Sequence, residues 1–498
     1  MKKRDLYYER IPTKLLREDF RLLGTFLGKV IKDQEGKNFF NIVEKFRLIS
    51  KNTKKDKNKR KVFSKISSEV KKLSPLNSFK LTRAFSHILN LLNLAESLDA
   101  SRKLNEYENP YFKNKNQNLF IEDLINGLFK NKKISNRKIY EQATKLDIGI
   151  VLTAHPTEVK RRTLIQKYAN LIDILEKRHL YKKYPSKIIE LDRQLYSEIA
   201  IIWKTDELKR TKPSPIDEAR WGLAVIEDSL WDTIPKVYKR LNDIFRKNLK
   251  KDLPRDFNPI QFGSWMGGDR DGNPNVTAEV TKKVLLFSRW QAAKLYDKEL
   301  TKLIQDLSME ECSAKIKKVT GKSFEPYRVF LRPIRNKVRL THQLIENHLN
   351  NNSYLDEKKL IQNKYEITLP LREVRNSLKL NREDHIANAD LLDLMRRVRC
   401  FGINLARLDI RQEADRHTKL LNELFRKKYN IKYNSLSEKE KIKLLNKLIK
   451  EKNYFVDRIK ITNKENKEVW NTFKQISKTP HECLGAYVIS MTSTASDI

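Results

Sequence analysis

Four short apolar segments decide how this sequence folds: DIGIVLTAH at 147–155, PIQFGSWMGGD at 259–269, CFGINLARLDIRQ at 400–412 and AYVISMT at 486–492. Each is too short for a full helix, and long stretches with an amphipathic helical pattern separate them. Three of the four end in polar or charged residues. Short buried strands spaced by helices are typical of a parallel α/β sheet, whose chemistry lies at the C-terminal ends of the strands.

The rest of the chain has the period of amphipathic helices, with apolar residues at steps of three and four. Two such series are Leu16, Phe20, Leu23, Leu27 and Ile31, and Leu81, Phe85, Ile88/Leu89 and Leu92. These patterns predict a mainly α-helical protein, with an N-terminal helical region over 1–146 and the strand segments over 147–498. A closed eight-stranded barrel needs twice the four strands that the sequence shows.

The composition narrows the class of protein. No apolar run approaches the roughly 18 residues of a membrane span, and no apolar stretch follows the basic N-terminus as in a signal peptide. The three cysteines, Cys312, Cys400 and Cys483, form no CxxC pair, which excludes a disulfide framework and a cysteine-based zinc site. We therefore expect a cytoplasmic protein that does not bind membranes.

The net charge of +40, from 103 basic and 63 acidic residues, allows two interpretations. Lys and Arg that neutralise phosphates drive nucleic-acid binding, which the charge alone would favour. However, the densest basic run, KNTKKDKNKRK at 51–61, contains no aromatic residues for base stacking. We favour solvated helix faces over a polyanion-binding surface and expect no nucleic-acid partner.

The segment VLTAHPTEVKRRTL at 151–164 places His155 between a strand and a helix, because Pro156 suits the first turn of a helix. A neutral imidazole at such a junction accepts a proton near pH 7. A core histidine bonded to a backbone carbonyl is an equally weighted alternative. Arg161 and Arg162 follow one to two turns later.

The segment FGSWMGGDRDGNPNVT at 262–277 combines glycines with the charged triplet Asp269, Arg270 and Asp271. The glycines permit backbone conformations that other residues avoid, so a tight loop is expected. It matches neither a dinucleotide fingerprint nor a Walker loop. Asp269 and Asp271 are explained equally well as structural caps of the turn. Arg270 is not, because a guanidinium beside a glycine turn suits a phosphate or carboxylate.

The segment ARLDIRQEADRHT at 406–418 contains Arg411 near the end of the third strand. If residues 405–411 are extended, Asp409 and Arg411 share one face of the strand. Taken alone, this pattern leaves a structural Asp409–Arg411 pair and an anion-binding Arg411 equally open.

Together these segments resemble the phosphoenolpyruvate carboxylase family. VLTAHPTE is similar to the family's histidine signature and GSWMGGDRDGNP to its second hallmark loop. Further matching segments follow in the family's order: TDELKR, DEARWGLAVIEDSLW, EPYR, LDIRQE and YVISMT. LREDFRLLG and AFSHILNLLNLAE extend the resemblance towards the N-terminus.

The resemblance implies a mainly helical protein around a (β/α)8 barrel, of which this chain would hold about four strands with large helical insertions. It implies the carboxylation of phosphoenolpyruvate with bicarbonate to oxaloacetate and phosphate, which supplies the tricarboxylic acid cycle. It also implies catalytic roles for His155 and Arg411, and substrate binding by Trp265, Arg270 and Asp271. Arg161 and Arg162 would form an allosteric anion site, with Mg2+ or Mn2+ as cofactor and a homotetramer as the assembly.

The family continues well beyond YVISMT, whereas this chain stops at Ile498. We expect the metal ligands, the remaining barrel strands and a C-terminal helical region in that further part, with no metal ligand in this chain. The chain alone is therefore expected to be inactive, as a fragment of the enzyme. The alternative is a truncated, non-catalytic remnant that binds anions or forms an interaction surface.

Overall fold

A computed structural model describes residues 14–52, 59–107, 121–131, 133–153, 162–206, 213–254, 256–451 and 459–498. The chain divides into two compact units, Met1–Gln117 with Lys160–Arg210, and Asn118–Val159 with Thr211–Ile498. Within the described ranges, every helix is too short or too polar to cross a membrane.

The described residues of the first unit form five helices: α2 (Lys14–Asn52), α3 (Lys59–Val70), α4 (Pro75–Tyr107), α7 (Arg162–Leu180) and α8 (Pro185–Lys204). The predicted stripe on α2 is confirmed, because Leu23, Leu27 and Ile31 are buried. They pack with Leu171 of α7 and Leu195 of α8 in one core. Helices α7 and α8 follow the first strand in sequence but pack with α2 and α4. The predicted domain boundary at residue 146 stays a prediction.

The second unit contains all four strands and the remaining helices. Its longer elements are α5 (Ile121–Lys130), α6 (Asn136–Ala143), β1 (Ile148–Leu152), α9 (Pro215–Val225), α10 (Trp231–Leu249), β2 (Ile260–Ser264), α11 (Ala278–Asp306), α12 (Ala314–Thr320), α13 (Pro326–Asn351), α14 (Tyr365–Leu380), α15 (Asp384–Ala387), α16 (Asp390–Phe401), β3 (Arg407–Glu413), α17 (Ala414–Tyr429), α18 (Glu438–Glu451), α19 (Lys464–Lys478) and β4 (Leu484–Ser490). A π-helical turn, Ile226–Leu230, joins α9 to α10.

The four strands form one sheet in the order β1-β2-β3-β4, with every neighbouring pair parallel. The predicted mainly helical fold with four parallel strands is therefore confirmed, while the (β/α)8-type barrel, incomplete in this chain, stays a prediction. The third strand starts later than its apolar segment, since Cys400 and Phe401 end α16. Leu405 then has a positive φ of 45°, which belongs to a turn, and the strand begins at Arg407.

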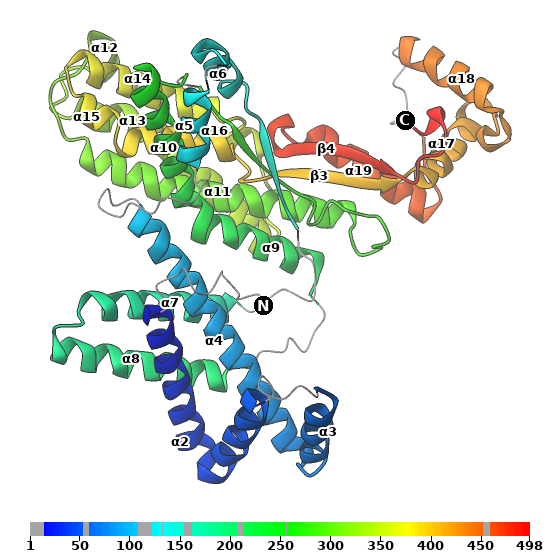
Figure 1. Cartoon of the computed structure of the whole chain (residues 1–498). Helices are drawn as coiled ribbons and strands as arrows, with labels where there is room; N and C mark the ends of the chain where they lie inside the picture. The colour runs from blue at the N-terminus through cyan, green and yellow to red at the C-terminus, as the bar shows by residue number, and fades with distance from the viewer. Residues whose placement is uncertain are drawn as a thin grey trace. The chain divides into compact units, whose positions relative to one another are not determined.

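A large apolar core holds the sheet against its helices (Figure 1). Helix α16 packs on β2, and α11 packs on α9, α13, α16 and α19. A row of stacked rings connects the sheet to α16 and α10. The ring centroid of Phe262 on β2 lies 5.3 Å from that of Phe401, which lies 5.3 Å from that of Trp231 on α10. Burial of such large aromatic surfaces is a main source of folding free energy. The core therefore fixes β2 and β3, which carry the candidate site.

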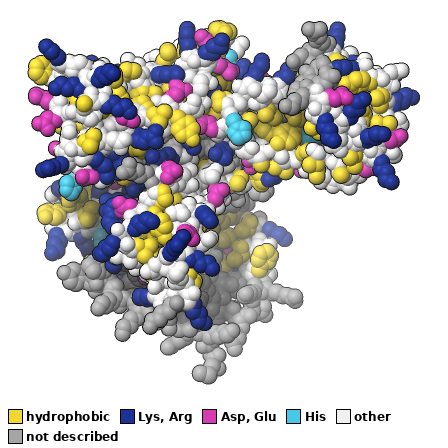
Figure 2. Space-filling view, turned by 90° about the horizontal axis from the view of Figure 1, so that it is seen from above, with side chains coloured by type: hydrophobic (Ala, Val, Ile, Leu, Met, Phe, Trp, Pro, Cys, Tyr) yellow, Lys and Arg dark blue, Asp and Glu magenta, His cyan; other side chains and the backbone are white. Residues whose placement is uncertain are grey.

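The basic side chains are spread rather than gathered on the face of the molecule seen in Figure 2. Where Figure 2 colours the side chains of this face, Lys and Arg are scattered among acidic and apolar ones. Many of them form ion pairs on helix faces, such as Lys177 with Asp173 and Arg137 with Glu141. This distribution agrees with the interpretation of the charge as solvated helix faces.

Candidate active site

The C-terminal ends of β1, β2 and β3 meet at one edge of the sheet, which we call the C-terminal edge. Leu152 of β1 aligns with Ser264 of β2, and Ser264 aligns with Leu408 of β3. Strand β3 continues beyond this level to Glu413. The 265–270 loop, which follows β2, therefore emerges beside the last residues of β3.

This loop is tied to β3 by backbone hydrogen bonds. The carbonyl of Trp265 accepts from the amides of Gly268 (2.8 Å) and Asp269 (3.0 Å), which closes a tight turn. The amide of Arg411 donates to the carbonyl of Gly268 (3.0 Å), and the amide of Arg270 donates to the carbonyl of Arg411 (3.1 Å). The loop thus extends the sheet by one bridge, between Asp269 and Arg411.

Two glycines allow this close approach. A Cβ atom on Gly268 would lie 2.0 Å from the backbone oxygen of Asp409, a distance that real Cβ atoms do not reach. Gly267 has a φ of 81°, and a Cβ there would lie 2.5 Å from Val284 of α11. The pair of glycines in GSWMGGD is therefore required by the contact with β3 and α11.

Arg270 lies under the loop and braces it. Its side chain is 2% exposed, and its guanidinium donates to the carbonyl of Gly268 (2.9 Å) and to the hydroxyl of Thr281 (2.6 Å). The Thr281 hydroxyl in turn donates to the carbonyl of Gly267 (2.7 Å). Burial lowers the pKa of Arg270 from its usual value. These contacts support a positioning role, and its predicted role in substrate binding stays a prediction.

Arg411 is the cation that the loop and β3 present at the edge. Its guanidinium lies over the ring of Trp265, 3.8 Å from the ring centroid. Its side chain is 32% exposed, and Nη1 lies 3.9 Å from the carboxylate of Asp269, too far for a strong hydrogen bond. Nε of Arg411 is buried and has no hydrogen-bond partner within the described part of the chain, so the exposed part of the guanidinium is its other end. A partly exposed guanidinium that is oriented but not saturated is suited to binding an anion.

The sequence left open whether Arg411 pairs with Asp409 or binds an anion, and the structure shows what Asp409 contacts. The carboxylate of Asp409 accepts a hydrogen bond from the amide of Ala486 (2.8 Å), where β4 has an irregular register opposite β3. A Cβ on Gly485 would lie 2.0 Å from that same carboxylate. Asp409 therefore stabilises the β3–β4 pairing, and the acidic neighbour of Arg411 is Asp269.

Asp269 and Gln412 are residues of this edge that the sequence analysis did not assign to the site. Asp269 accepts a hydrogen bond from the amide of Asp271 (3.0 Å), whose own side chain is exposed. Gln412 is 1% exposed, and its Nε2 has no partner in the ranges that the structure covers. The alternation along β3 is the signal that places Gln412 on the face opposite Arg411.

A histidine and a tyrosine form a second polar pair near the end of β3. Nε2 of His417 on α17 lies 2.7 Å from the hydroxyl of Tyr487 on β4. Burial lowers the pKa of His417, and burial raises the pKa of Tyr487 to about 12. Both groups are therefore neutral near pH 7, as suits a packed structural pair.

Three predicted site residues lie wholly or partly outside the described residues. His155 and Arg161 fall in the range 154–161, which the structure does not describe. Arg162 is the first residue of α7, and only its backbone is described. Their predicted roles stay predictions. Of the other four, Trp265 and Arg411 are in contact, Arg270 lies beneath them, and Asp271 follows at the surface.

The described residues do not fit a divalent cation. They contain no group of three or more His, Cys, Asp or Glu side chains that could hold a metal ion. At the C-terminal edge, Asp269 lies beside the Arg411 guanidinium, which competes with a cation for its oxygens. We therefore derive no step of the mechanism through a metal.

Comparison of the sequence with known proteins assigns this chain to a family. The phosphoenolpyruvate carboxylase family model matches residues 16–498. The chain is 37% identical to the phosphoenolpyruvate carboxylase of Acinetobacter baylyi over 499 residues, and 37% identical to that of Pectobacterium atrosepticum over 485. Each match covers 97% of this chain and 54% of the relative, so the chain spans about half the length of the curated relatives it matches. With hallmark segments, parallel strands and edge residues in this order, the chain belongs to the phosphoenolpyruvate carboxylase family.

Proposed function

We propose that this chain forms part of an enzyme that carboxylates phosphoenolpyruvate with bicarbonate, giving oxaloacetate and phosphate. The observation that carries the proposal is Arg411, stacked on Trp265 at the C-terminal edge with its side chain 32% exposed. Family membership supports the same reaction, because the relatives bear that name.

In this proposal Arg411 binds the phosphate or the enolate oxygen of the substrate. The carboxylate of Asp269, 3.9 Å away, orients the guanidinium without saturating it, so an anion can take its donors. Trp265 is half-buried and packs against the apolar core, and it covers one face of the guanidinium. Lower water access strengthens the attraction between Arg411 and the charge that develops on the substrate.

His155 is proposed as the proton acceptor, taking the proton of the carboxyl group of carboxyphosphate so that CO2 forms beside the enolate. Strand β1 directs the chain towards the C-terminal edge, since Leu152 is level with Ser264 and Trp265 follows Ser264. A neutral imidazole can accept this proton at neutral pH.

The other residues of the edge take supporting roles. Arg270 holds the 265–270 loop in place through Gly268 and Thr281, and Asp271 is proposed to shape the rim of the pocket. The (β/α)8 barrel, the homotetramer, the cytoplasmic location and the Mg2+ or Mn2+ requirement are further proposals from the family. So is an allosteric anion site at Arg161 and Arg162.

The test is a complete enzyme in which residues 16–498 replace the matching half of the Acinetobacter baylyi relative. Far-UV circular dichroism and a cooperative unfolding transition would establish that it folds. We expect oxaloacetate formation, measured by coupling to malate dehydrogenase. His155→Asn should abolish oxaloacetate formation but retain bicarbonate-dependent phosphate release. A His155→Asn enzyme that makes oxaloacetate at the unsubstituted rate would show that another group accepts the proton.

A further inference from the structure

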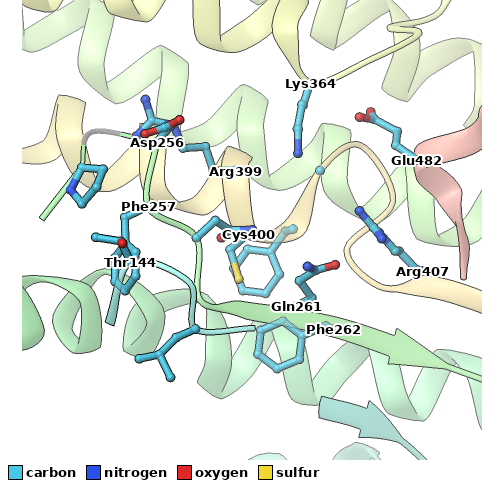
Figure 3. Close-up of a pocket in the computed structure, with 15 residues that line it drawn as sticks. Thr144, Asp256, Phe257, Gln261, Phe262, Lys364, Arg399, Cys400, Arg407 and Glu482 are labelled. Atoms are coloured by element: carbon cyan, nitrogen blue, oxygen red, sulfur yellow. The ribbon is translucent and has the colours of Figure 1, made fainter. Parts of the chain in front are cut away.

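A pocket lies at the edge of the sheet opposite the C-terminal edge, where the strands begin (Figure 3). Its volume is about 500 Å³. Its lining includes Gln261 at the start of β2, Arg407 at the start of β3 and Glu482 just before β4. The proposed active site uses none of these residues. Arg407 and Arg411 lie four residues apart on one strand, which separates their Cα atoms by about 13 Å.

Three basic side chains from separate parts of the chain line this pocket. Lys364 directly precedes α14, Arg399 is in the last turn of α16, and Arg407 is the first residue of β3. In Figure 3 the ends of Lys364 and Arg407 extend towards the same part of the pocket, with Glu482 beside them. Since the three cations come from different elements, the fold rather than the local sequence gathers them.

The acidic side chains of the pocket do not cancel this positive charge. Burial raises the pKa of Glu482, while Lys364, Arg407 and Arg289 act to lower it. Burial lowers the pKa of Arg399, and Asp256 acts to raise it. Three nearby cations, Arg375, Arg372 and Arg396, lower it further. Two carboxylates, of Asp256 and Glu482, thus line the pocket together with three cations, and Oε1 of Glu482 has no hydrogen-bond partner among the described residues.

The floor of the pocket is apolar and chemically inert. Phe257, Phe262 and Phe401 line it, and the thiol of Cys400 points to the carbonyl of Ile260 (3.4 Å). Burial raises the pKa of the Cys400 thiol to about 12, so it stays protonated and is not a nucleophile near pH 7. An apolar floor beside the cations of Lys364 and Arg407 is suited to binding an anion rather than to covalent chemistry.

We infer that this pocket binds a small anion with two or more negative charges, of phosphate or polycarboxylate chemistry, between Lys364 and Arg407, while Arg399 lies beside Asp256. Guanidinium groups bind both classes through paired N–H donors, and the lysine adds a point charge. Glu482 lies against Lys364 and Arg407 and limits the affinity, because its carboxylate competes with the ligand for both cations. This site is distinct from the proposed active site and does not depend on it.

The test is isothermal titration of the 498-residue chain with pyrophosphate and, separately, with citrate. A salt concentration of about 0.15 M reduces the Debye length to about 8 Å and so suppresses diffuse binding to the basic surface. The titrations are made in the unsubstituted chain and in Arg411→Gln, which removes the C-terminal edge as a competing anion site. Binding of pyrophosphate alone would identify phosphate chemistry, and binding of citrate alone would identify a polycarboxylate.

Three substitutions then test the location. Arg407→Gln should weaken binding at least tenfold, because it removes a charged hydrogen-bond donor. Arg332→Gln removes the same charge from an exposed position on α13 outside the pocket and should leave the affinity unchanged. Glu482→Gln should tighten binding several-fold, a gain that misfolding cannot produce.

Equal losses in Arg407→Gln and Arg332→Gln would overturn the inference, since the anion would then respond only to net charge. So would weaker binding in Glu482→Gln, or the absence of measurable binding of both probes. Loss of binding in Arg411→Gln, with none in Arg407→Gln, would place the anion at the C-terminal edge and would leave the proposed function standing without this pocket.

Discussion

Replacing Gly268 by alanine tests whether the 265–270 loop is positioned by its contact with β3. The new Cβ would lie 2.0 Å from the backbone oxygen of Asp409, so the loop must move by more than about 1 Å to reach ordinary van der Waals contact. That shift breaks the 3.0 and 3.1 Å bonds that join Gly268 and Arg270 to Arg411. At about 0.5–1.5 kcal/mol for each bond, the loss is about 1–3 kcal/mol.

The assay is hydrogen exchange of peptides that cover residues 407–413, together with urea unfolding. Gly268→Ala should speed the exchange of these amides and lower the free energy of unfolding by the amount above. Gly149→Ala in β1 is the matched control, because a Cβ there meets no atom within 4 Å. If both variants show the same exchange and the same unfolding free energy to within about 0.5 kcal/mol, the reasoning from loop contact is refuted.

Three further predictions concern charge, pH and packing. Asp269→Asn should tighten phosphoenolpyruvate binding at Arg411 several-fold in calorimetry, because it removes a carboxylate 3.9 Å from the guanidinium; weaker binding would contradict this. Burial acts to raise the pKa of Glu423, but hydrogen bonds from Lys427 and its other partners outweigh it and lower the pKa to about 2. The stability that this carboxylate contributes is thus present above its ordinary pKa of 4.5 and is lost as the pH falls from there towards 2. Urea unfolding of Glu423→Gln should show about 1–3 kcal/mol less stability at pH 7 and a flatter acid limb; an unchanged pH profile would count against it. Leu331→Ala should cost about 2–5 kcal/mol in thermal and urea unfolding, because that side chain of α13 is 0% exposed. The half-exposed Leu340 on the same helix serves as control, and equal costs would disprove the burial argument.

The strands and helices could be predicted because their signals are local. A compact apolar run marks each strand in the sequence. On α2, the apolar residues that recur at steps of three and four form its buried face. The start of β3 could not be located in this way, since Cys400 and Phe401 are as apolar as strand residues but complete the buried face of α16. Only the turn at Leu405, with its positive φ, separates the two elements.

The partners of charged residues could not be predicted, because they come from distant parts of the chain. The sequence favoured an anion as the partner of Arg270, whereas its guanidinium donates to Gly268 and to Thr281 at the start of α11. Likewise, the alternation along β3 left open whether Arg411 pairs with Asp409 or binds an anion. The amide of Ala486, where β3 and β4 pair irregularly, donates to the Asp409 carboxylate instead. The acidic neighbour of Arg411 is Asp269, from the loop after β2.

The most direct measurement is kcat/KM for oxaloacetate formation in the complete enzyme carrying residues 16–498, compared between Arg411→Gln and Arg407→Gln. Both substitutions remove one positive charge from the same strand, at opposite edges of the sheet. The proposed function predicts a loss of about 10–100-fold for Arg411→Gln, mostly in kcat, and nearly unchanged turnover at saturating substrate for Arg407→Gln. A folded Arg411→Gln enzyme with undiminished kcat/KM would contradict the assignment of the C-terminal edge as the active site.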